Sequence, residues 1–353
     1  MIVTAAELRD LVYHIFHSAG CGADEAGCIA RHLVESNLVG HDSHGVIRVA
    51  SYVQWLREGK VFADRTASVI LESEAIVVLD GGFGFGQSIG EQAMARGIEM
   101  AERHGVAVVA LRNSGHLGRI GDWAEMSARA GKISLHWVNT TGAGILVSPF
   151  GGIDRRLSAN PISAGIPTAS GEPMVVDISA CTIAEGKIRV ALNKGVPVPE
   201  NTIIDGAGRP TTDPGVFYSE PGAILPIAGH KGYALSMVCE VLAGALTGSG
   251  CSNVEHGGRV ANGMLSILMD RSFFGEVAAF DAEIERFVAY VKSSRPAAPG
   301  GSILMPGEPE AESKRRKLEH GIELDPNTWA QICGAARQVG AQHPLLDRPF
   351  EPA

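Results

Sequence analysis

The sequence predicts an α/β fold in which a mainly parallel or mixed sheet accompanies a helical part built from both chain ends. Three observations support this. The first 60 or so residues show only helical periodicity, while from residue 75 short apolar runs of strand length alternate with helical segments. The chain also contains 44 glycines, which cluster between the apolar runs where tight turns are needed. With 353 residues, it is long enough for two or three domains.

The N-terminal residues 1–70 are predicted to be helical. Thr4 and Glu7 have the spacing of a capping box, and apolar residues follow at helical intervals. A second helix is expected after Asp24 and a third over residues 46–56. These helices should pack against C-terminal helices in residues 308–345, of which the last begins at the N-cap pair Asp325-Pro326.

Residues 71–260 are predicted to form the α/β core, and residues 261–353 a strand and helices that complete the fold. Strands are expected at 75–79, 106–111, 132–139, 162–166, 174–178 and 265–269. Helices are expected at 87–104, 123–130, from 182 onwards, at 233–247 and at 282–292. The Pro- and Gly-rich residues 195–222 should be an extended loop.

The glycine cluster Gly81–Gly86 resembles a dinucleotide-binding loop only superficially. A G-x-G-x-x-G pattern beginning at Gly84 would need glycine at Ile89, and one beginning at Gly82 would need it at Gln87. A turn or packing role is therefore the better prediction for this cluster.

The richest concentration of reactive side chains is the stretch from Gly40 to Arg48, which contains Ser43 and His44. Histidine titrates near neutral pH, and arginine binds a carboxylate through two hydrogen bonds. If residues 46–56 are helical, His44 and Arg48 project from the same side. A proton carrier beside a carboxylate clamp suits a 2-hydroxy or 2-oxo acid. A simple helix N-cap with surface histidines is an equally good interpretation of this stretch alone.

Three later segments also carry polar groups at places that favour ligands. His116 and Arg119 share a glycine-rich loop at the end of the strand at 106–111, although His116 can alternatively be a simple cap. Asp177 ends a strand, where it can accept a ribose hydroxyl or cap the next segment. His230 and Lys231 begin a strongly apolar helix that we expect to be buried. This arrangement opposes the helix dipole unless an anion binds there.

Composition excludes several classes of protein. Lys plus Arg total 30 against 39 for Asp plus Glu, a net charge of −9 that argues against nucleic acid or an anionic membrane as partner. No apolar run is long enough to span a bilayer, and no signal peptide is evident. The six cysteines are scattered without a C-x-x-C pair, so we expect a reduced, cytoplasmic protein without a zinc framework or other metal site.

Taken together, the ordered motifs resemble those of the malate/L-lactate dehydrogenase family that is unrelated to the Rossmann-fold dehydrogenases. The resemblance covers about residues 4–340. It rests on G-H-D-S-H-G at 40–45, N-S-G-H-L-G-R-I-G at 113–121, the 177–187 segment, P-T-T-D-P at 210–214, H-K-G-Y at 230–233 and M-P-G-E at 305–308. The runs at 119–125 and 194–199 are most similar to the hydroxycarboxylate dehydrogenase branch of this family.

The resemblance implies a non-Rossmann nicotinamide-binding domain, a homodimer, and hydride transfer between NAD or NADP and a 2-oxo or 2-hydroxy acid. Malate, lactate and a bulkier aromatic acid are all open as substrate. One alternative is a reductase of cyclic imino acids. Relatives with that activity carry aspartate where this chain has Lys187. Another alternative is a catalytically silent nicotinamide-binding regulator. The intact set of polar residues at 40–48 and 113–121 argues against this alternative.

The resemblance also assigns site residues. The residues expected to line the cofactor are His44, Gly118, Arg119, Ile120, Val175, Val176, Asp177, Ile178, Ser179, His230, Lys231, Asn262, Gly307, Glu308, Pro309 and Glu310. Ser43, Arg48, His116 and Lys187 are expected to act on the substrate. His44 and His116 are rival acid–base residues, and we favour His44 because Ser43 and Arg48 adjoin it in sequence.

Overall fold

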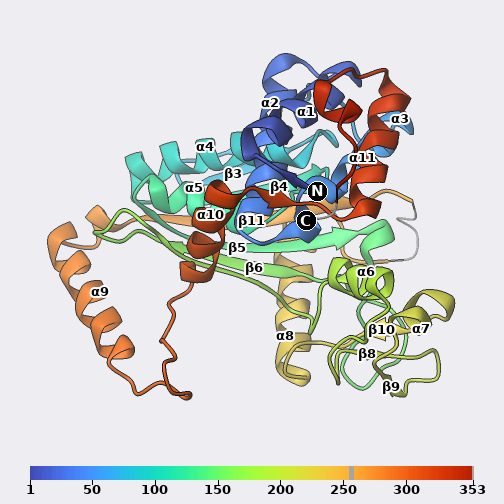
Figure 1. Ribbon diagram of the computed structural model, residues 1–353. Helices are drawn as coiled ribbons and strands as arrows, with labels where there is room; N and C mark the ends of the chain where they lie inside the picture. Colours follow the sequence, from blue (N-terminus) through green and yellow to red (C-terminus); the bar gives the residue numbers. More distant parts are fainter. Residues whose placement is uncertain (254–257, 352–353) are drawn as a thin grey trace.

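A seven-stranded mixed sheet forms the centre of the computed structural model, which describes residues 1–253 and 258–351 (Figure 1). The strand order is β2 (Ser68–Glu72), β3 (Ile76–Asp80), β4 (Val106–Ser114), β11 (Ala261–Asp270), β5 (Lys132–Thr141), β6 (Pro161–Ile166) and β7 (Met174–Ser179). β3 and β4 run parallel, and the other adjacent pairs run antiparallel. The predicted α/β fold is confirmed, with a mixed rather than a mainly parallel sheet.

The central strand β11 comes from late in the chain. It pairs with β4 on one side and β5 on the other, placing Ser266 opposite both Val109 and His136. Seven of its ten residues are buried, because neighbouring strands cover both of its edges and helices cover its faces. It extends further toward the N-terminus than the predicted strand at 265–269.

Helices α4 (Gly86–His104) and α5 (Gly121–Arg129) pack on one face of this sheet. Their contact is close because Gly90 has no side chain. A Cβ there would lie 2.4 Å from the ring of Trp123, which is fully buried. This packing fixes the beginning of α5, and with it the loop that precedes it.

The two chain ends form one helical body, as predicted (Figure 1). Its core is shared by α1 (Ala5–Ser18), α2 (Ala23–Leu38), α3 (Val49–Arg57) and α11 (Pro326–Val339). α10 (Glu308–His320) has no buried residue and contacts the end of α2 from outside, through Ser313 and Lys317. β1 (Ile2–Val3) pairs with β12 (Ile322–Glu323). The predicted capping box is present at the start of α1, where Thr4 and Glu7 bond reciprocally.

Residues 195–222 are not the extended loop that was predicted. They contribute β8 (Ile203–Ile204), β9 (Pro210–Thr211) and α7 (Pro214–Ser219), and β10 (Ala223–Ile224) completes a three-stranded sheet. The reason is local burial, since Ile203, Ile224 and Phe217 share a small apolar core. Helix α6 (Glu185–Lys194) likewise begins at Glu185 rather than directly after Thr182, because 180–182 pair with the 225–227 segment.

Two helices present apolar side chains outward. α8 (His230–Cys239) continues as a π-helical segment over Glu240–Leu246, so the predicted helix at 233–247 begins earlier. It is not buried as expected, since Val241 and Leu246 are 54% and 62% exposed. α9 (Val277–Lys292) projects away from the sheet and contains no buried residue (Figure 1).

No helix in the described part of the chain has both the length and the apolar character needed to cross a membrane. All six cysteines lie in described segments and are free thiols.

Candidate active site

Residues 42–48 form two short 3-10 turns, η1 (Asp42–His44) and η2 (Val46–Arg48), and α3 begins only at Val49. The predicted helix over 46–56 is therefore wrong in its first turn. The cause is Asn37, whose carboxamide accepts the Val46 N–H at 2.8 Å and donates to Asp42 at 2.7 Å. A Cβ at Gly45 would lie 2.2 Å from Asn37 Oδ1, so only glycine fits between the turns.

Arg48 is oriented by the turn that precedes it. Its Nε donates to the Ser43 carbonyl oxygen at 2.6 Å, so a backbone bond, and not the side-by-side placement of a helix, relates it to the histidine stretch. Arg48 forms no ion pair with any residue of the described chain. Its guanidinium charge is therefore available to an anionic ligand.

The rings of His44 and His116, which come from different segments of the chain, lie parallel to each other. Their ring centroids lie 5.8 Å apart with 2° between the planes, and His44 Nδ1 is 3.2 Å from Ser43 Oγ. Burial and then the charge of Arg48 lower the pKa of His116 to about 3. Burial, His116 and Arg48 hold the pKa of His44 well below its ordinary value. Both rings are therefore neutral at pH 7 in the ligand-free site.

The glycine cluster at 81–86 supports the His116 loop. Gly115 N donates to Gly84 O, and a Cβ at Gly86 would lie 2.2 Å from the His116 carbonyl oxygen. On the other side, Leu117 N donates to Asn262 Oδ1 at 2.8 Å. The predicted packing role of the cluster is confirmed, and Asn262 contacts the same loop.

Sequence reasoning missed two residues that reach the site. Tyr52 Oη lies 2.7 Å from His116 Nδ1, and Gln87 Nε2 donates to Tyr52 Oη at 3.1 Å. Tyr52 lies one helical turn after Arg48, which was the only available signal, but periodicity alone identifies it as a core residue.

The loop after His116 leads into a buried charge network. Arg119 is 2% exposed; its Nη1 donates to Asp122 at 2.9 Å and its Nε lies 3.7 Å from Asp177 Oδ2. Asp177 also accepts the Gly121 N–H at 2.9 Å. The structure thus brings two of the predicted cofactor segments, 118–120 and 175–179, together around Arg119 and Asp177.

β7 lies beside the beginning of α10, which adds one further predicted segment, 307–310. Val175 N donates to Pro306 O at 3.3 Å, and Gly307, with φ of +95°, lies against Val175. Glu310 accepts a hydrogen bond from His41 Nε2 at 3.4 Å, which ties α10 to the histidine stretch. Val176, Ile178, Ser179 and Pro309 lie within these same segments.

Other predicted residues lie outside this cluster. His230 and Lys231 are exposed at the start of α8, where His230 contacts the ring of Phe150. Glu308 pairs with Lys292 and accepts the Met305 N–H. Lys187 is exposed, although the preceding Gly186 lies against Ser43.

A nicotinamide cofactor fits these residues. The buried Nε of Arg119 has no hydrogen-bond acceptor within the described chain, and Gly118 beside it has φ of +72°. The charge of Arg119 is already balanced by Asp122, Glu125 and Asp177, so the buried, unbonded Nε–H suits a ligand that offers a neutral acceptor such as a hydroxyl oxygen.

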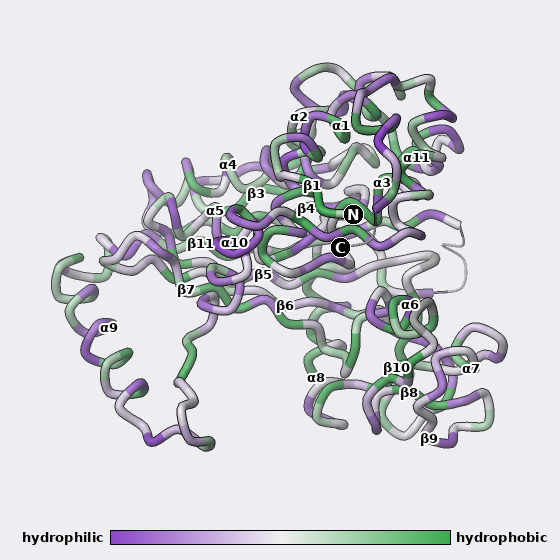
Figure 2. Tube along the Cα trace, viewed as in Figure 1, coloured by the Kyte–Doolittle hydropathy of each residue, from purple (hydrophilic) through white to green (hydrophobic). Residues whose placement is uncertain are grey.

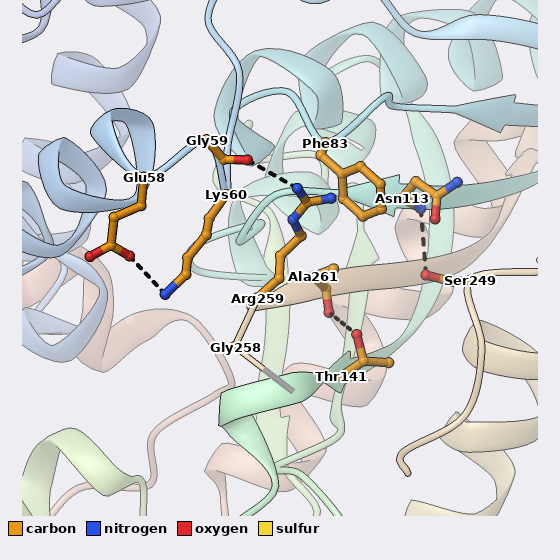
Figure 3. Close-up of a pocket in the computed structure, with 10 residues that line it drawn as sticks. All are labelled: Glu58, Gly59, Lys60, Phe83, Asn113, Thr141, Ser249, Gly258, Arg259 and Ala261. Carbon is orange, nitrogen blue, oxygen red and sulfur yellow. Dashed lines mark hydrogen bonds and ion pairs between the residues drawn. The ribbon is translucent and has the colours of Figure 1, made fainter. Parts of the chain in front are cut away.

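A separate cavity of about 470 Å³ adjoins the site at the end of β4 (Figure 3). Its lining residues are Glu58, Gly59, Lys60, Phe83, Asn113, Thr141, Ser249, Gly258, Arg259 and Ala261. Arg259 stacks on Phe83 at 4.0 Å and donates to the Gly59 carbonyl at 3.0 Å. The reactive cluster around Arg48 and His116 is not part of this lining.

Cys28, His32 and Glu91 offer ligand atoms within 4.8 Å of one another, the spacing of a possible metal site. Both nitrogens of His32 already pair with carboxylates, with Asp122 at 2.7 Å and Glu91 at 3.0 Å. Burial alone would lower the pKa of His32, but the hydrogen bonds to Asp122, Cys28 and Glu91 raise it to about 11. The geometry is that of a buried ion-pair network joining α2, α4 and α5.

Comparison with known proteins agrees with the residue pattern. A family model described as malate/L-lactate dehydrogenase matches residues 3–333. Hydroxycarboxylate dehydrogenase B of Escherichia coli (strain K12) is 42% identical over 97% of this chain and 95% of its own length. L-lactate dehydrogenase of Cupriavidus necator is 36% identical over 98% of this chain and 99% of its own length.

Solved structures show the same architecture. A structure described as a candidate malate/lactate dehydrogenase from E. coli superposes with a TM-score of 0.94 at 41% identity, covering 98% of both chains. Delta1-piperideine-2-carboxylate reductase from Pseudomonas syringae superposes with a TM-score of 0.82 at 30% identity, covering 95% of this chain and 100% of that one.

Proposed function

Because the chain belongs to the malate/L-lactate dehydrogenase family, we propose that it transfers hydride between NAD or NADP and a 2-oxo or 2-hydroxy carboxylic acid. Its relatives are dehydrogenases of hydroxy acids, and the chain is an oxidoreductase that acts on a CH–OH group. Malate, lactate and a bulkier aromatic hydroxy acid are the substrates proposed for it.

The observation that carries this proposal is the free charge of Arg48 beside two neutral imidazoles. The guanidinium, fixed by its bond to Ser43 O, would bind the substrate carboxylate. The substrate hydroxyl would then lie near His44 and His116, whose rings accept a proton because both are neutral at pH 7. Gly186 lies against Ser43, which brings the next residue, Lys187, to the same side of the site. Ser43 Oγ and Lys187 would bind the substrate oxygen that Arg48 does not contact.

We assign the acid–base role to His116. The sequence neighbours of His44 favoured that residue, but His116 has the shorter bond to a buried orienting group, Tyr52 Oη at 2.7 Å. A base held by a second group is the arrangement that proton transfer requires. In oxidation, the substrate O–H bond would break and His116 Nε2 would take the proton. His44, bonded to Ser43, would position substrate and cofactor.

The cofactor would be held by the segments that meet around Arg119 and Asp177. When bound, it would accept the substrate hydride in oxidation and return it in reduction. The Nε–H of Arg119 is the donor available to the cofactor, since it has no acceptor within the described chain. The proposed cofactor-lining residues are those assigned from the sequence, and the segments 118–120, 175–179 and 307–310 are central among them. His230 and Lys231 would reach it only if the exposed start of α8 faces the ligand.

The test is an absorbance assay of nicotinamide oxidation with NADH and NADPH against a panel of 2-oxo acids and piperideine-2-carboxylate. Turnover of a 2-oxo acid is expected. Turnover of the cyclic imine alone would instead select the imine reductase, whose Pseudomonas representative shares the fold. Tight NADH binding with no turnover of any compound would select the silent regulator.

We also propose a homodimer. Exposed apolar side chains lie on two helices: Leu235, Val238 and Val241 on the α8 segment, and Phe287 and Tyr290 on α9. Figure 2 shows apolar colour along α8 and in patches on α9. Patches of this kind on a soluble protein mark association surfaces. Light scattering should give twice the chain mass, and Phe287→Glu should shift the protein toward monomer; a wild-type monomer would contradict the proposal.

A further inference from the structure

Tyr52 connects the interior of the helical body to His116. It is 1% exposed, and its ring packs against Phe16, Phe85 and Trp55. Its hydroxyl meets two polar groups, His116 Nδ1 at 2.7 Å and Gln87 Nε2 at 3.1 Å. Gln87, also 1% exposed, comes from the first turn of α4. These three side chains form a continuous hydrogen-bonded line.

The direction of the hydrogen bonds along this line determines what His116 can do. With Nδ1 bonded to Tyr52, Nε2 is the nitrogen left for a substrate. A neutral imidazole carries its hydrogen on one nitrogen and accepts through the other. If Tyr52 donates to Nδ1, the hydrogen lies on Nε2, and His116 cannot accept a proton there. If Nδ1–H donates to Tyr52 Oη, Nε2 has a free lone pair and acts as a base.

Gln87 decides between these directions. In the orientation in which its Nε2–H donates to Tyr52 Oη, the tyrosine hydroxyl is directed toward His116 Nδ1. The other end of this amide, Oε1, is buried and has no hydrogen-bond partner within the described chain, so the surroundings of that end do not fix the orientation of the amide. The two ends of a carboxamide have nearly the same shape, so the side chain fits this space in either orientation. When it is turned over, Oε1 accepts the tyrosine hydroxyl hydrogen and Tyr52 Oη becomes free to accept from Nδ1–H.

We infer that in the working enzyme Gln87 Oε1 faces Tyr52, so that Tyr52 donates to Gln87 and accepts from His116 Nδ1–H. Gln87 and Tyr52 are then positioning residues that hold His116 as the Nδ1–H tautomer. The inference rests on the proposed function, since it names the partners of its acid–base group. The imidazolium formed after proton uptake also carries Nδ1–H, so the same orientation serves both protonation states and nothing in the line must turn during a cycle.

The direct test is nitrogen NMR of the full-length enzyme at pH 7 with its twelve histidines labelled with 15N. His116 is assigned by the signals lost in His116→Asn. The inference requires an Nδ1–H pattern at this ring, and an Nε2–H pattern overturns it. This readout needs no substrate, so it is independent of whether any 2-oxo acid is turned over.

Substitutions at Gln87 separate tautomer control from simple packing. Gln87→Glu keeps an acceptor for Tyr52 and should keep both the Nδ1–H pattern and kcat within about threefold. Gln87→Met has similar volume but no strong acceptor; it should shift His116 toward Nε2–H and lower kcat by about tenfold or more, with the Kd for cofactor unchanged. Wild-type kcat and an unchanged tautomer in Gln87→Met would overturn the inference.

Tyr52→Phe removes the hydroxyl and leaves the ring in place. Its kcat should fall by about tenfold to a hundredfold. The matched control is Tyr13→Phe, which deletes a hydroxyl in the same helical body, on α1, without touching the line to His116. Equal loss of kcat in both variants would mean a general packing effect and would overturn the positioning role.

Discussion

The imidazole rings of His44 and His116 lie parallel, 5.8 Å apart, although the first comes from the turn η1 and the second from the loop that follows β4 of the central sheet. A positive charge on either ring raises the cost of charging the other, and Arg48 adds to that cost. The pair can therefore take up only one additional proton at a time during turnover. Replacing each ring separately should then show which of the two takes the substrate proton.

Replacing the acid–base residue should affect kcat far more than binding. We expect His116→Ala to lower kcat by about two to four decades with cofactor Kd largely kept. His44→Ala should mainly raise KM or the cofactor Kd, because it removes an orienting contact. Steady-state kinetics and a cofactor titration of both variants distinguish the roles. Loss of kcat confined to His44→Ala would reverse the assignment.

Arg48 should be the anchor for the substrate carboxylate. Loss of a charge-assisted, two-bond contact should weaken transition-state binding by about 2–4 kcal/mol, or roughly two to three decades in kcat/KM, in Arg48→Ala. Arg57→Ala is the matched control, since Arg57 ends α3, the helix that follows Arg48, and its side chain hydrogen-bonds Gln338 at the surface. An unchanged kcat/KM in Arg48→Ala would exclude the carboxylate role.

The buried His136 should make the free energy of unfolding decrease as the pH is lowered. Its ring is fully buried between Ser266 and Ser134, and burial lowers its pKa to about 3. In the unfolded chain the pKa lies near 6.5, so below that pH the unfolded state binds the extra proton. The contribution of the neutral His136 ring to the free energy of unfolding is therefore complete above about pH 6.5 and is lost as the pH falls toward 3.

The measurement is urea unfolding of the wild type and of His136→Gln between pH 7 and pH 4.5. This group alone should contribute a slope of about 1.4 kcal/mol per pH unit in the wild type, and the slope should be smaller by up to that amount in His136→Gln. Parallel pH profiles for wild type and His136→Gln would contradict the prediction.

The sequence predicted those parts of the fold that depend on local signals. The capping box at Thr4 and the apolar periodicity of α1, α2 and α4 are short-range patterns, and they are present in the structure. The 203–224 region lacked such a signal, because β8 and β10 are two residues long and are held by pairing across the chain. A segment of this length that is rich in Pro and Gly is therefore predicted to be a loop, because its strands become evident only from their pairing with distant residues.

The same division applies to the site. Ser43, His44, Arg48 and His116 were predicted because reactive side chains concentrate near them in sequence. Tyr52 could not be assigned to the site, since its hydroxyl meets a histidine 64 residues away and helical periodicity gives only its burial. Nor could the break at Gly45, which depends on the Asn37 side chain bridging two turns.

The contact between Gly186 and Ser43 gives a prediction about the substrate side of the site. A Cβ at Gly186 would lie 2.6 Å from Ser43 Cβ, much closer than such atoms normally approach. Gly186→Ala should therefore displace Ser43, and with it the carbonyl that orients Arg48 and the hydroxyl beside His44. Alanine is the better helix former, so α6 itself should not be weakened.

We expect Gly186→Ala to lower kcat/KM by about tenfold or more while the thermal midpoint changes little. Gly27→Ala is the matched control, because a Cβ at that helical glycine meets nothing within 4 Å. The decisive measurement is a double-mutant cycle with Ser43→Gly, which removes the atom that the new methyl group would meet. If the contact causes the loss, adding Gly186→Ala to Ser43→Gly should cost little further activity. Additive losses in the double variant would show that α6 acts on the site by another route.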